Sequence, residues 1–280
     1  MDKHITGKQL AAFERQLRLE EREPATIEKY LRDIRVFAAW LGGSPLDKEA
    51  AVAWKGHLLA SGYAPSTINS MLIAVNRFFR FQRWDELRVK TIRVQRRIFR
   101  SREKELTKEE YARLLDTAHG LGRERLALLM EAICATGIRV SEVRYITVEA
   151  ARAGRAEIAL KGKIRTILLP GKLRRKLLKY AKKQNTGSGE IFLTRTGKGL
   201  SRRQIWAEMK AICKKAGVAP SKVFPHNLRH LFARTFYRVC RDVVQLADVL
   251  GHSSVETTRI YLASTGDEYV RRMNRLGLIS

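Results

Sequence analysis

The stretch from Phe224 to Leu262 constrains this chain most, because residues that start and stop helices divide it into three short helical segments. Apolar side chains recur at helical spacing over 226–240, which predicts an amphipathic helix. A second helix over 242–250 is expected to end at Gly251, since glycine readily takes the left-handed conformation that follows many helix ends. The third helix begins in a Ser-Ser-Val-Glu sequence that has the pattern of a capping box.

These segments carry two histidines, an arginine and a tyrosine. His226 and Arg229 are three residues apart and therefore share a helix face, while His252 and Tyr261 follow on the later segments. A guanidinium binds two phosphate oxygens with its planar fork, and histidine moves protons near neutral pH. A phenol becomes a nucleophile when nearby positive charge stabilises its anion. Each residue alone is more often structural, but together they suit a phosphodiester substrate.

A further motif lies upstream, where residues 135–142 read Ala-Thr-Gly-Ile-Arg-Val-Ser-Glu. With this box, the chain resembles the tyrosine recombinases of the phage integrase family, in size and layout those of the Xer type. Family members carry an arginine, a lysine, a His-x-x-Arg pair, a histidine or tryptophan, and a nucleophilic tyrosine. The resemblance covers nearly the whole chain and implies six catalytic residues: Arg139, Lys161, His226, Arg229, His252 and Tyr261 (the nucleophile).

The identity of the catalytic lysine and the role of one glutamate stay open. The alternating residues 156–160 and 164–169 predict a β-hairpin with a glycine turn, and Lys161 on it is the best match to the family's lysine. The hairpin is about a residue shorter than the family's pattern, so Lys163 stays an alternative. Glu142 is expected to orient the first arginine or to cap a backbone group.

The charge of the chain indicates a polyanionic partner. The formal net charge is +27 and the pI is about 10.6, which points to nucleic acid. Ribosomal and chromatin proteins are also very basic, but they are usually shorter or richer in tails. Neither a carboxylate cluster nor a metal-binding Cys/His spacing occurs, and the resemblance likewise implies no metal, ATP or other cofactor.

Cysteine usage and hydropathy indicate the compartment. The three cysteines, Cys134, Cys213 and Cys240, lie in apolar helical stretches without paired spacing, so they are interpreted as buried thiols in a reducing compartment. The N-terminus lacks the apolar core of a signal peptide, and no 18-residue apolar run occurs. We therefore expect a cytoplasmic, nucleoid-associated protein without membrane contact.

Uneven charge predicts three parts, namely a domain over 1–87, a basic linker over 88–104 and a catalytic domain over 105–280. The linker holds eight basic residues and one acidic residue, whereas the first part is nearly neutral. Helices are expected in the first part over 6–20, 25–41, 47–60 and 66–83, which would form a four-helix bundle. The family's SAM-like core-binding domain is such a bundle and clamps one side of a DNA duplex.

DNA contact by the bundle must come from a local patch, because its net charge is low. Any single polar residue there is equally well explained as part of a solvated face. The residues expected to contact DNA in the bundle and the linker are Lys55, Thr67, Asn69, Arg77, Arg80, Arg93, Arg96, Arg97 and Arg100.

The third part is expected to be an α+β catalytic domain, so the whole chain is mainly α with a small β-sheet. Besides the hairpin, residues Glu190–Thr194 are candidates for a third strand. Apolar residues at helical spacing over 264–280 predict a tail helix, which in the family docks on a neighbouring protomer. Docking on its own domain is the alternative. Further helices are expected over 107–119, 123–136, 140–146, 171–184 and 201–216.

The resemblance implies site-specific recombination by a homotetramer on two double-stranded DNA sites, through a 3′-phosphotyrosine intermediate. Two alternatives stay open. A type IB topoisomerase shares the nucleophile chemistry but acts as a monomer, and a non-catalytic DNA-binding protein would keep the fold alone.

Overall fold

The structure is a computed structural model that describes residues 3–93, 104–160, 163–252, 254–262 and 273–276. Contacts between Cα atoms divide the chain into two compact units, Met1–Arg96 and Arg97–Ser280. This border falls inside the segment 88–104 that is expected to be a linker. Three of its predicted DNA contacts, Arg96, Arg97 and Arg100, lie outside the described residues.

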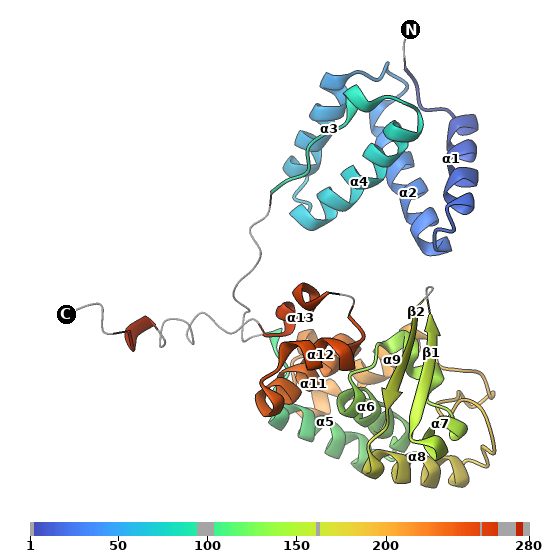
Figure 1. Cartoon of the computed structure of the whole chain (residues 1–280), viewed down its shortest axis with the longest axis vertical. Helices are drawn as coiled ribbons and strands as arrows, with labels where there is room; N and C mark the ends of the chain where they lie inside the picture. Colours follow the sequence, from blue (N-terminus) through green and yellow to red (C-terminus); the bar gives the residue numbers. More distant parts are fainter. Residues whose placement is uncertain (1–2, 94–103, 161–162, 253, 263–272, 277–280) are drawn as a thin grey trace. The chain divides into compact units, whose positions relative to one another are not determined.

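The first unit is a bundle of four helices (Figure 1), as the fold class predicts. Proline at the first helical position starts α2 and α4, and side-chain caps start α1 and α3. Aromatic side chains from all four helices fill its core, among them Phe13, Phe37, Trp54 and Phe78, each exposed by no more than 1%. The bounds are α1 (Gly7–Leu19), α2 (Pro24–Leu41), α3 (Lys48–Ala60), α4 (Pro65–Phe81) and the 3₁₀ turn η1 (Asp85–Leu87).

The extended chain after η1 is fastened to α4 by two asparagines. The side-chain amide of Asn76 donates to the carbonyl of Val89 and its oxygen accepts from the same residue's N–H, at 2.8 and 2.9 Å. Asn69 forms the same pair of bonds with Ile92, at 2.9 and 2.7 Å. Residues 88–92 therefore belong to the bundle, although the charge pattern groups them with the linker.

The second unit surrounds α6, whose residues are buried on most sides and pack against α5, α8, α9 and α11 (Figure 1). Two antiparallel strands pair from Arg155↔Leu168 to Leu160↔Lys163, which confirms the hairpin. The bounds are α5 (Lys108–Gly120), α6 (Glu124–Thr136), η3 (Val140–Tyr145), α7 (Val148–Ala153), β1 (Arg155–Leu160), β2 (Lys163–Leu168), α8 (Gly171–Lys183), α9 (Arg202–Ala211), α10 (Cys213–Ala216), η4 (Pro220–Lys222), α11 (Pro225–Cys240), α12 (Val243–Leu250) and α13 (Val255–Leu262).

The predicted third strand over Glu190–Thr194 is wrong. Ile191 and Phe192 are consecutive and both buried, so this segment enters the core with two adjacent side chains instead of alternating between faces. Only isolated bridges form there. The helix predicted over 201–216 is divided into α9 and α10, and the short helix α7 was not predicted.

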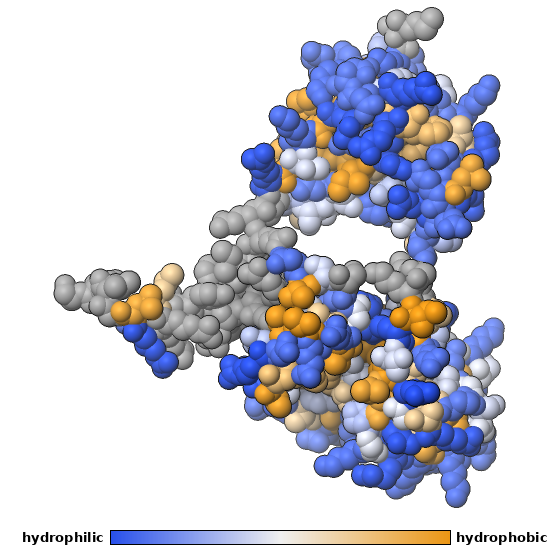
Figure 2. Space-filling view, in the orientation of Figure 1, coloured by the Kyte–Doolittle hydropathy of each residue, from blue (hydrophilic) through white to orange (hydrophobic). Residues whose placement is uncertain are grey.

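The surface in view is mostly hydrophilic, with hydrophobic residues scattered over both units (Figure 2). Among the described residues, no helix combines the length and the apolar character needed to cross a bilayer.

Candidate active site

Arg229 on α11 is the centre of the site. Its residue is 1% exposed, so its cation lies in the interior. It donates to the carbonyl of Gly137, to the carbonyl of Leu250 at 2.8 Å, to Nε2 of His252 at 2.9 Å and to the hydroxyl of Tyr261 at 3.3 Å. Burial lowers the pKa of the Arg229 guanidinium. None of these four partners is a carboxylate, so among the described residues only dipoles solvate the positive charge.

Two glycine turns position the carbonyl groups of Gly137 and Leu250, which accept hydrogen bonds from Arg229. Gly137 ends α6 and Gly251 ends α12, with φ angles of 65° and 63°, in the left-handed region. A Cβ atom at Gly137 would lie 2.4 Å from the ring of Phe232, so no other residue fits without rearrangement. These two turns therefore set the position of Arg229's acceptors.

Arg139 follows the first of these turns and is held by a buried carboxylate. Its Nη1 donates to Oε1 of Glu142 at 3.0 Å, and its backbone N–H donates to Oε2 at 2.7 Å. The Glu142 residue is 2% exposed, while the side chain of Arg139 is 41% exposed. The expectation that Glu142 orients the arginine or caps a backbone group is confirmed on both counts, and the guanidinium keeps a face open to solvent.

Tyr261 on α13 lies within a group of imidazoles. Its ring centroid is 4.3 Å from that of His230, 5.5 Å from that of His252 and 5.9 Å from that of His226. The tyrosine is 5% exposed. Its hydroxyl accepts a hydrogen bond from Nε of the Arg229 guanidinium.

His252 is a neutral imidazole with an assigned tautomer. Because a guanidinium can only donate, Nε2 accepts from Arg229, and the proton on Nδ1 then faces the hydroxyl of Thr258 at 2.8 Å. Burial first, and the charge of Arg229 second, lower the pKa of His252 to about 4. Arg139, Arg165 and His226 contribute further in the same direction. His252 therefore acts near pH 7 through hydrogen bonds and not through charge.

The structure brings together five of the six predicted catalytic residues, since Arg139, His226, Arg229, His252 and Tyr261 all interact within this group. The sixth, Lys161, lies outside the described residues. Its alternative, Lys163, is the first residue of β2, and its side chain is not among those described. The choice between the two lysines stays open.

Sequence reasoning missed two members of the site, His230 and Arg165. His230 is 2% exposed and contacts Tyr261. It lies four residues after His226, a spacing that places both on one helix face. Arg165 donates to Glu142 and to the carbonyl of Leu250. Its only sequence signal was its place on the predicted strand 164–169, directly after the two candidate lysines.

The predicted DNA contacts among the described residues fall into two groups. Lys55, Asn69 and Arg77 have partners in the protein: Lys55 donates to the carbonyl of Lys90, Asn69 pairs with the Ile92 backbone, and Arg77 binds Glu20 at 2.5 Å. The exposed residues are Thr67, Arg80 and Arg93. Basic side chains line a groove of about 460 Å³ beside α4, among them Arg77, Arg80, Arg88 and Lys90.

Comparison with known families places both units. The model of the phage integrase family matches residues 104–268, and that of the phage integrase N-terminal SAM-like domain matches residues 10–86. The tyrosine recombinase XerA of Thermococcus kodakarensis is 30% identical over 276 residues, covering 95% of this chain and 94% of the relative. The tyrosine recombinase XerD of Brucella suis is 30% identical over 270 residues, covering 84% and 85% of the two chains.

Among solved structures, the chain is similar to lambda integrase (residues 75–356), crystallised as a dimer bound to a COC′ core site. The alignment has a TM-score of 0.74 at 18% identity and covers 91% of this chain and 94% of the integrase chain. The sequence identity and the family models agree with the geometry of the site. The chain therefore belongs to the phage integrase family, the family of the tyrosine recombinases.

Proposed function

We propose that this protein is a site-specific DNA recombinase that cuts and rejoins strands through a phosphotyrosine at Tyr261, without metal or ATP. The observation that carries the proposal is the buried Arg229 guanidinium, which contacts both the Tyr261 hydroxyl and His252. A cation with only neutral partners is well suited to an anionic phosphate. The net charge of +27 supports DNA as the source of that phosphate.

In the proposed reaction, the Tyr261 oxygen attacks a scissile phosphorus, and the bond from phosphorus to the 5′ oxygen breaks. Arg139 and Arg229 bind the non-bridging oxygens and stabilise the charge that develops on them. His226 assists as base or donor, and His252 adds a hydrogen bond to the phosphate. The leaving 5′ oxygen takes a proton from Lys161, or from Lys163 as the alternative.

The products of this step are a 3′-phosphotyrosine and a free 5′-hydroxyl. The covalent bond conserves the energy of the phosphodiester, so the 5′-hydroxyl of a partner strand completes strand exchange by attacking the same phosphorus. Among similar structures, XerH is bound to its difH substrate and lambda integrase forms a tetramer on a Holliday junction. By analogy, we propose a homotetramer on two DNA sites at the nucleoid. Each protomer would have a DNA-binding domain over 1–87, onto which residues 88–92 pack, a basic linker that continues to residue 104, and a catalytic domain over 105–280.

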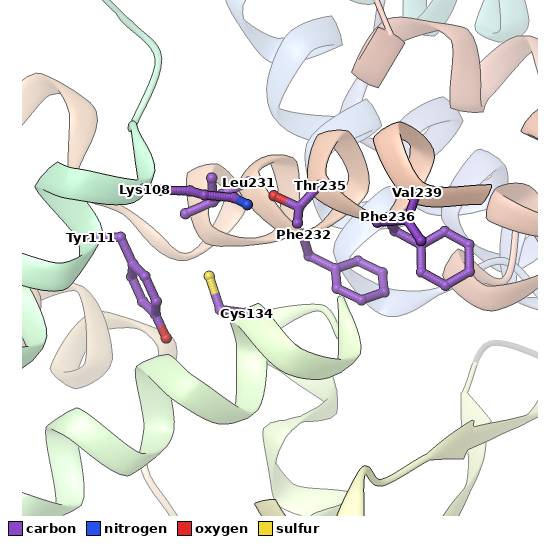
Figure 3. A pocket seen from close by; sticks show the side chains of 8 residues that line it. All are labelled: Lys108, Tyr111, Cys134, Leu231, Phe232, Thr235, Phe236 and Val239. Carbon is purple, nitrogen blue, oxygen red and sulfur yellow. The ribbon is translucent and has the colours of Figure 1, made fainter. Parts of the chain in front are cut away.

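The second unit has an apolar groove of about 480 Å³, which is the candidate binding site for the C-terminal tail (Figure 3). Lys108 and Tyr111 come from α5 and Cys134 from α6, and α11 supplies the longest side (Figure 3). The α11 residues are Leu231, Phe232, Thr235, Phe236 and Val239. We propose that the tail of a neighbouring protomer occupies this groove. Because α11 also carries Arg229, tail docking would couple assembly to the active site.

A complementation experiment tests whether the tail docks on the neighbour or on its own domain. A groove variant, Phe236→Glu, and a variant truncated after residue 269 should each bind DNA as single protomers but fail to form higher complexes in band-shift assays. Mixing the two should restore one interface per pair, because one protomer keeps its groove and the other its tail. Equal failure of the mixture and the separate variants would favour docking within one protomer.

The catalytic proposal is tested with nicked synthetic duplexes that tile the DNA flanking the gene. The wild-type protein should form a denaturant-resistant adduct on one or more duplexes, and Tyr261→Phe should form none while binding the same duplexes. Relaxation of supercoiled DNA without a defined site would support a topoisomerase instead. Binding by the wild type without cleavage of any duplex would support a non-catalytic DNA-binding protein.

A further inference from the structure

Arg165 occupies a position that the proposed reaction does not use. It comes from β2, and its side chain is 15% exposed. Nη2 donates to Oε2 of Glu142 at 2.5 Å, and Nη1 donates to the carbonyl of Leu250. Its Nε is buried without a hydrogen-bond partner among the described residues. The Arg165 guanidinium therefore donates both of its described hydrogen bonds within the protein, to the Glu142 carboxylate and to the Leu250 carbonyl at the end of α12.

Both acceptors of Arg165 are shared with the arginines proposed to bind phosphate. Glu142 also accepts from the side chain and the backbone N–H of Arg139. The carbonyl of Leu250 also accepts from Nη2 of Arg229, at 2.8 Å. One hydrogen-bonded acceptor thus separates Arg165 from each of them, and a displacement of Arg165 would release both acceptors.

The same side chain also supports the turn that precedes His252. A Cβ atom on Gly251 would lie 2.4 Å from Cδ and from Nη1 of Arg165. The backbone of the turn therefore lies directly against this side chain, which only a glycine permits. Arg165 thus contacts the end of α12 from the strand side, at the residue before the imidazole.

Stability alone is a weak reason for this arrangement. Arg139 and Arg165 share the carboxylate of Glu142, and Arg229 has no carboxylate among its described partners, so this group of three arginines keeps an excess of positive charge in a partly buried place. Burial first lowers the pKa of Arg165, against the opposing charge of Glu142, and the charge of Arg139 contributes in the same direction as burial. Replacing buried ion pairs by apolar residues is often neutral or stabilising, so such a cluster is better explained by an anion that arrives later.

We propose that Arg165 is a positioning residue, which holds Arg139 through Glu142 and holds the turn before His252 through the carbonyl of Leu250. Arg165 does not contact the reacting atoms. Its contribution to the rate comes from placing groups that stabilise charge on the non-bridging phosphate oxygens. This inference deepens the proposed function and rests on it.

The first test compares Arg165→Gln with a matched control on the same hairpin, Arg155→Gln, whose arginine is exposed on β1. The substrate is a nicked duplex carrying the cleavage position mapped with the wild type. Arg165→Gln should lower the cleavage rate by about 10- to 100-fold, the size typical of residues that orient a reactive group through a hydrogen bond without touching the substrate. The affinity for the duplex and the rate of Arg155→Gln should stay within about twofold of wild type.

A second substrate separates positioning from general damage. A methylphosphonate at the cleaved position replaces one charged oxygen by a methyl group, so stabilising charge there matters less. On this duplex the deficit of Arg165→Gln should shrink to within about threefold. The proposal would be overturned if Arg165→Gln cleaved the normal diester at the wild-type rate. It would also be overturned if the variant lost the same factor in rate on both substrates. Arg165→Lys keeps the charge without the fork and should fall in between, and it carries the test if Arg165→Gln does not fold.

A measurement without DNA separates this inference from the proposed function. The N–H of Arg139 donates to Glu142, and that of His252 donates to the carbonyl of Ala247. Hydrogen exchange of both amides should be faster in Arg165→Gln and unchanged in Arg155→Gln. Unchanged exchange in both variants would contradict the positioning role even if the wild type cleaves DNA. Absence of cleavage by the wild type would refute the proposed function alone.

Discussion

Each unit of the protein buries a charged side chain, and the two charges are treated in opposite ways. In the first unit Asp33 is 3% exposed and is neutralised by two cations of its own helix, Lys29 at 2.5 Å and Arg32 at 3.1 Å. In the second unit Arg229 is 1% exposed, and its partners are two carbonyls, an imidazole and a phenol. The charge of Asp33 is balanced within one helix, whereas the charge of Arg229 has no balancing carboxylate among its described partners and would be balanced by the phosphate of the proposed reaction.

The origin of the partners differs in the same way. The partners of Asp33 come from its own helix, whereas those of Arg229 come from the ends of α6 and α12 and from α13. Convergence from three distant segments requires the whole unit to be folded. The position of Arg229 therefore depends on several elements at once, whereas that of Asp33 depends on one helix.

The largest effect is expected for Arg229→Lys. Lysine retains the charge but loses the fork that joins four partners, so the cleavage rate should fall by about 10²- to 10³-fold, as for loss of one donor to a transition-state oxyanion. Single-turnover adduct formation on the mapped duplex measures it. The matched control is Arg234→Lys on the same helix, where the arginine pairs with Glu105 and the Leu106 carbonyl. Equal losses in both variants would contradict a specific role of Arg229 in cleavage.

The counterpart in the first unit is Asp33→Asn. Because Lys29 and Arg32 lose their common carboxylate, the free energy of unfolding should drop by about 1–2 kcal/mol, a value reduced for the exposure of the two cations. The cleavage rate at saturating DNA should stay at the wild-type value. Urea unfolding measures the first quantity. A loss of cleavage with unchanged stability would show that this charge, too, serves function.

The pH dependence of stability should come partly from His252. Its pKa is about 4 in the native state, below its ordinary value of 6.5. Between these values the unfolded chain binds a proton that the native state does not, so the free energy of unfolding falls as pH decreases through this window and levels off below it. In His252→Gln this part of the slope should disappear. Parallel stability curves for the two proteins from pH 7 to pH 4 would contradict the burial of a neutral imidazole.

The smallest effect is expected for Arg80→Ala on α4. Arg80 is exposed beside the basic groove, whereas Asn69 on the same helix is occupied with the Ile92 backbone. Loss of one phosphate contact should weaken DNA binding a few fold and lower the slope of log affinity against log salt by about 1. Asn69→Ala should instead cost about 1–2 kcal/mol of stability. The reverse pattern would show that the structural asparagine is also the DNA contact.

The proximity of the proposed catalytic residues was predictable because they belong to ordered motifs. His226 and Arg229 share a helix turn, and Gly251 fixes where the next helix ends, so local rules bring them close. Arg165 and His230 were missed since their roles depend on tertiary contacts across 23 and 31 positions. No local pattern distinguishes an arginine that reaches a buried carboxylate from one that faces water.

In the bundle, prediction succeeded for helices and gave little for function. Proline and capping residues set the helix starts, and apolar periodicity set the core. The role of Asn69 was not evident, because an asparagine that pairs with a passing backbone has the same sequence signature as one on a solvated face. The consecutive buried pair Ile191 and Phe192 explains the strand error in the same terms, since β-branched and aromatic residues also anchor loops.

In the proposed reaction, a buried cation without a carboxylate among its described partners prepares Tyr261 to attack a DNA phosphate. Mass spectrometry of the protease-digested covalent complex, formed on the mapped nicked duplex, tests it most directly. A nucleotide should be attached to the peptide that contains Tyr261, in a yield that falls with Arg229→Lys and not with Arg234→Lys. A nucleotide on another residue, such as Tyr237, would contradict it.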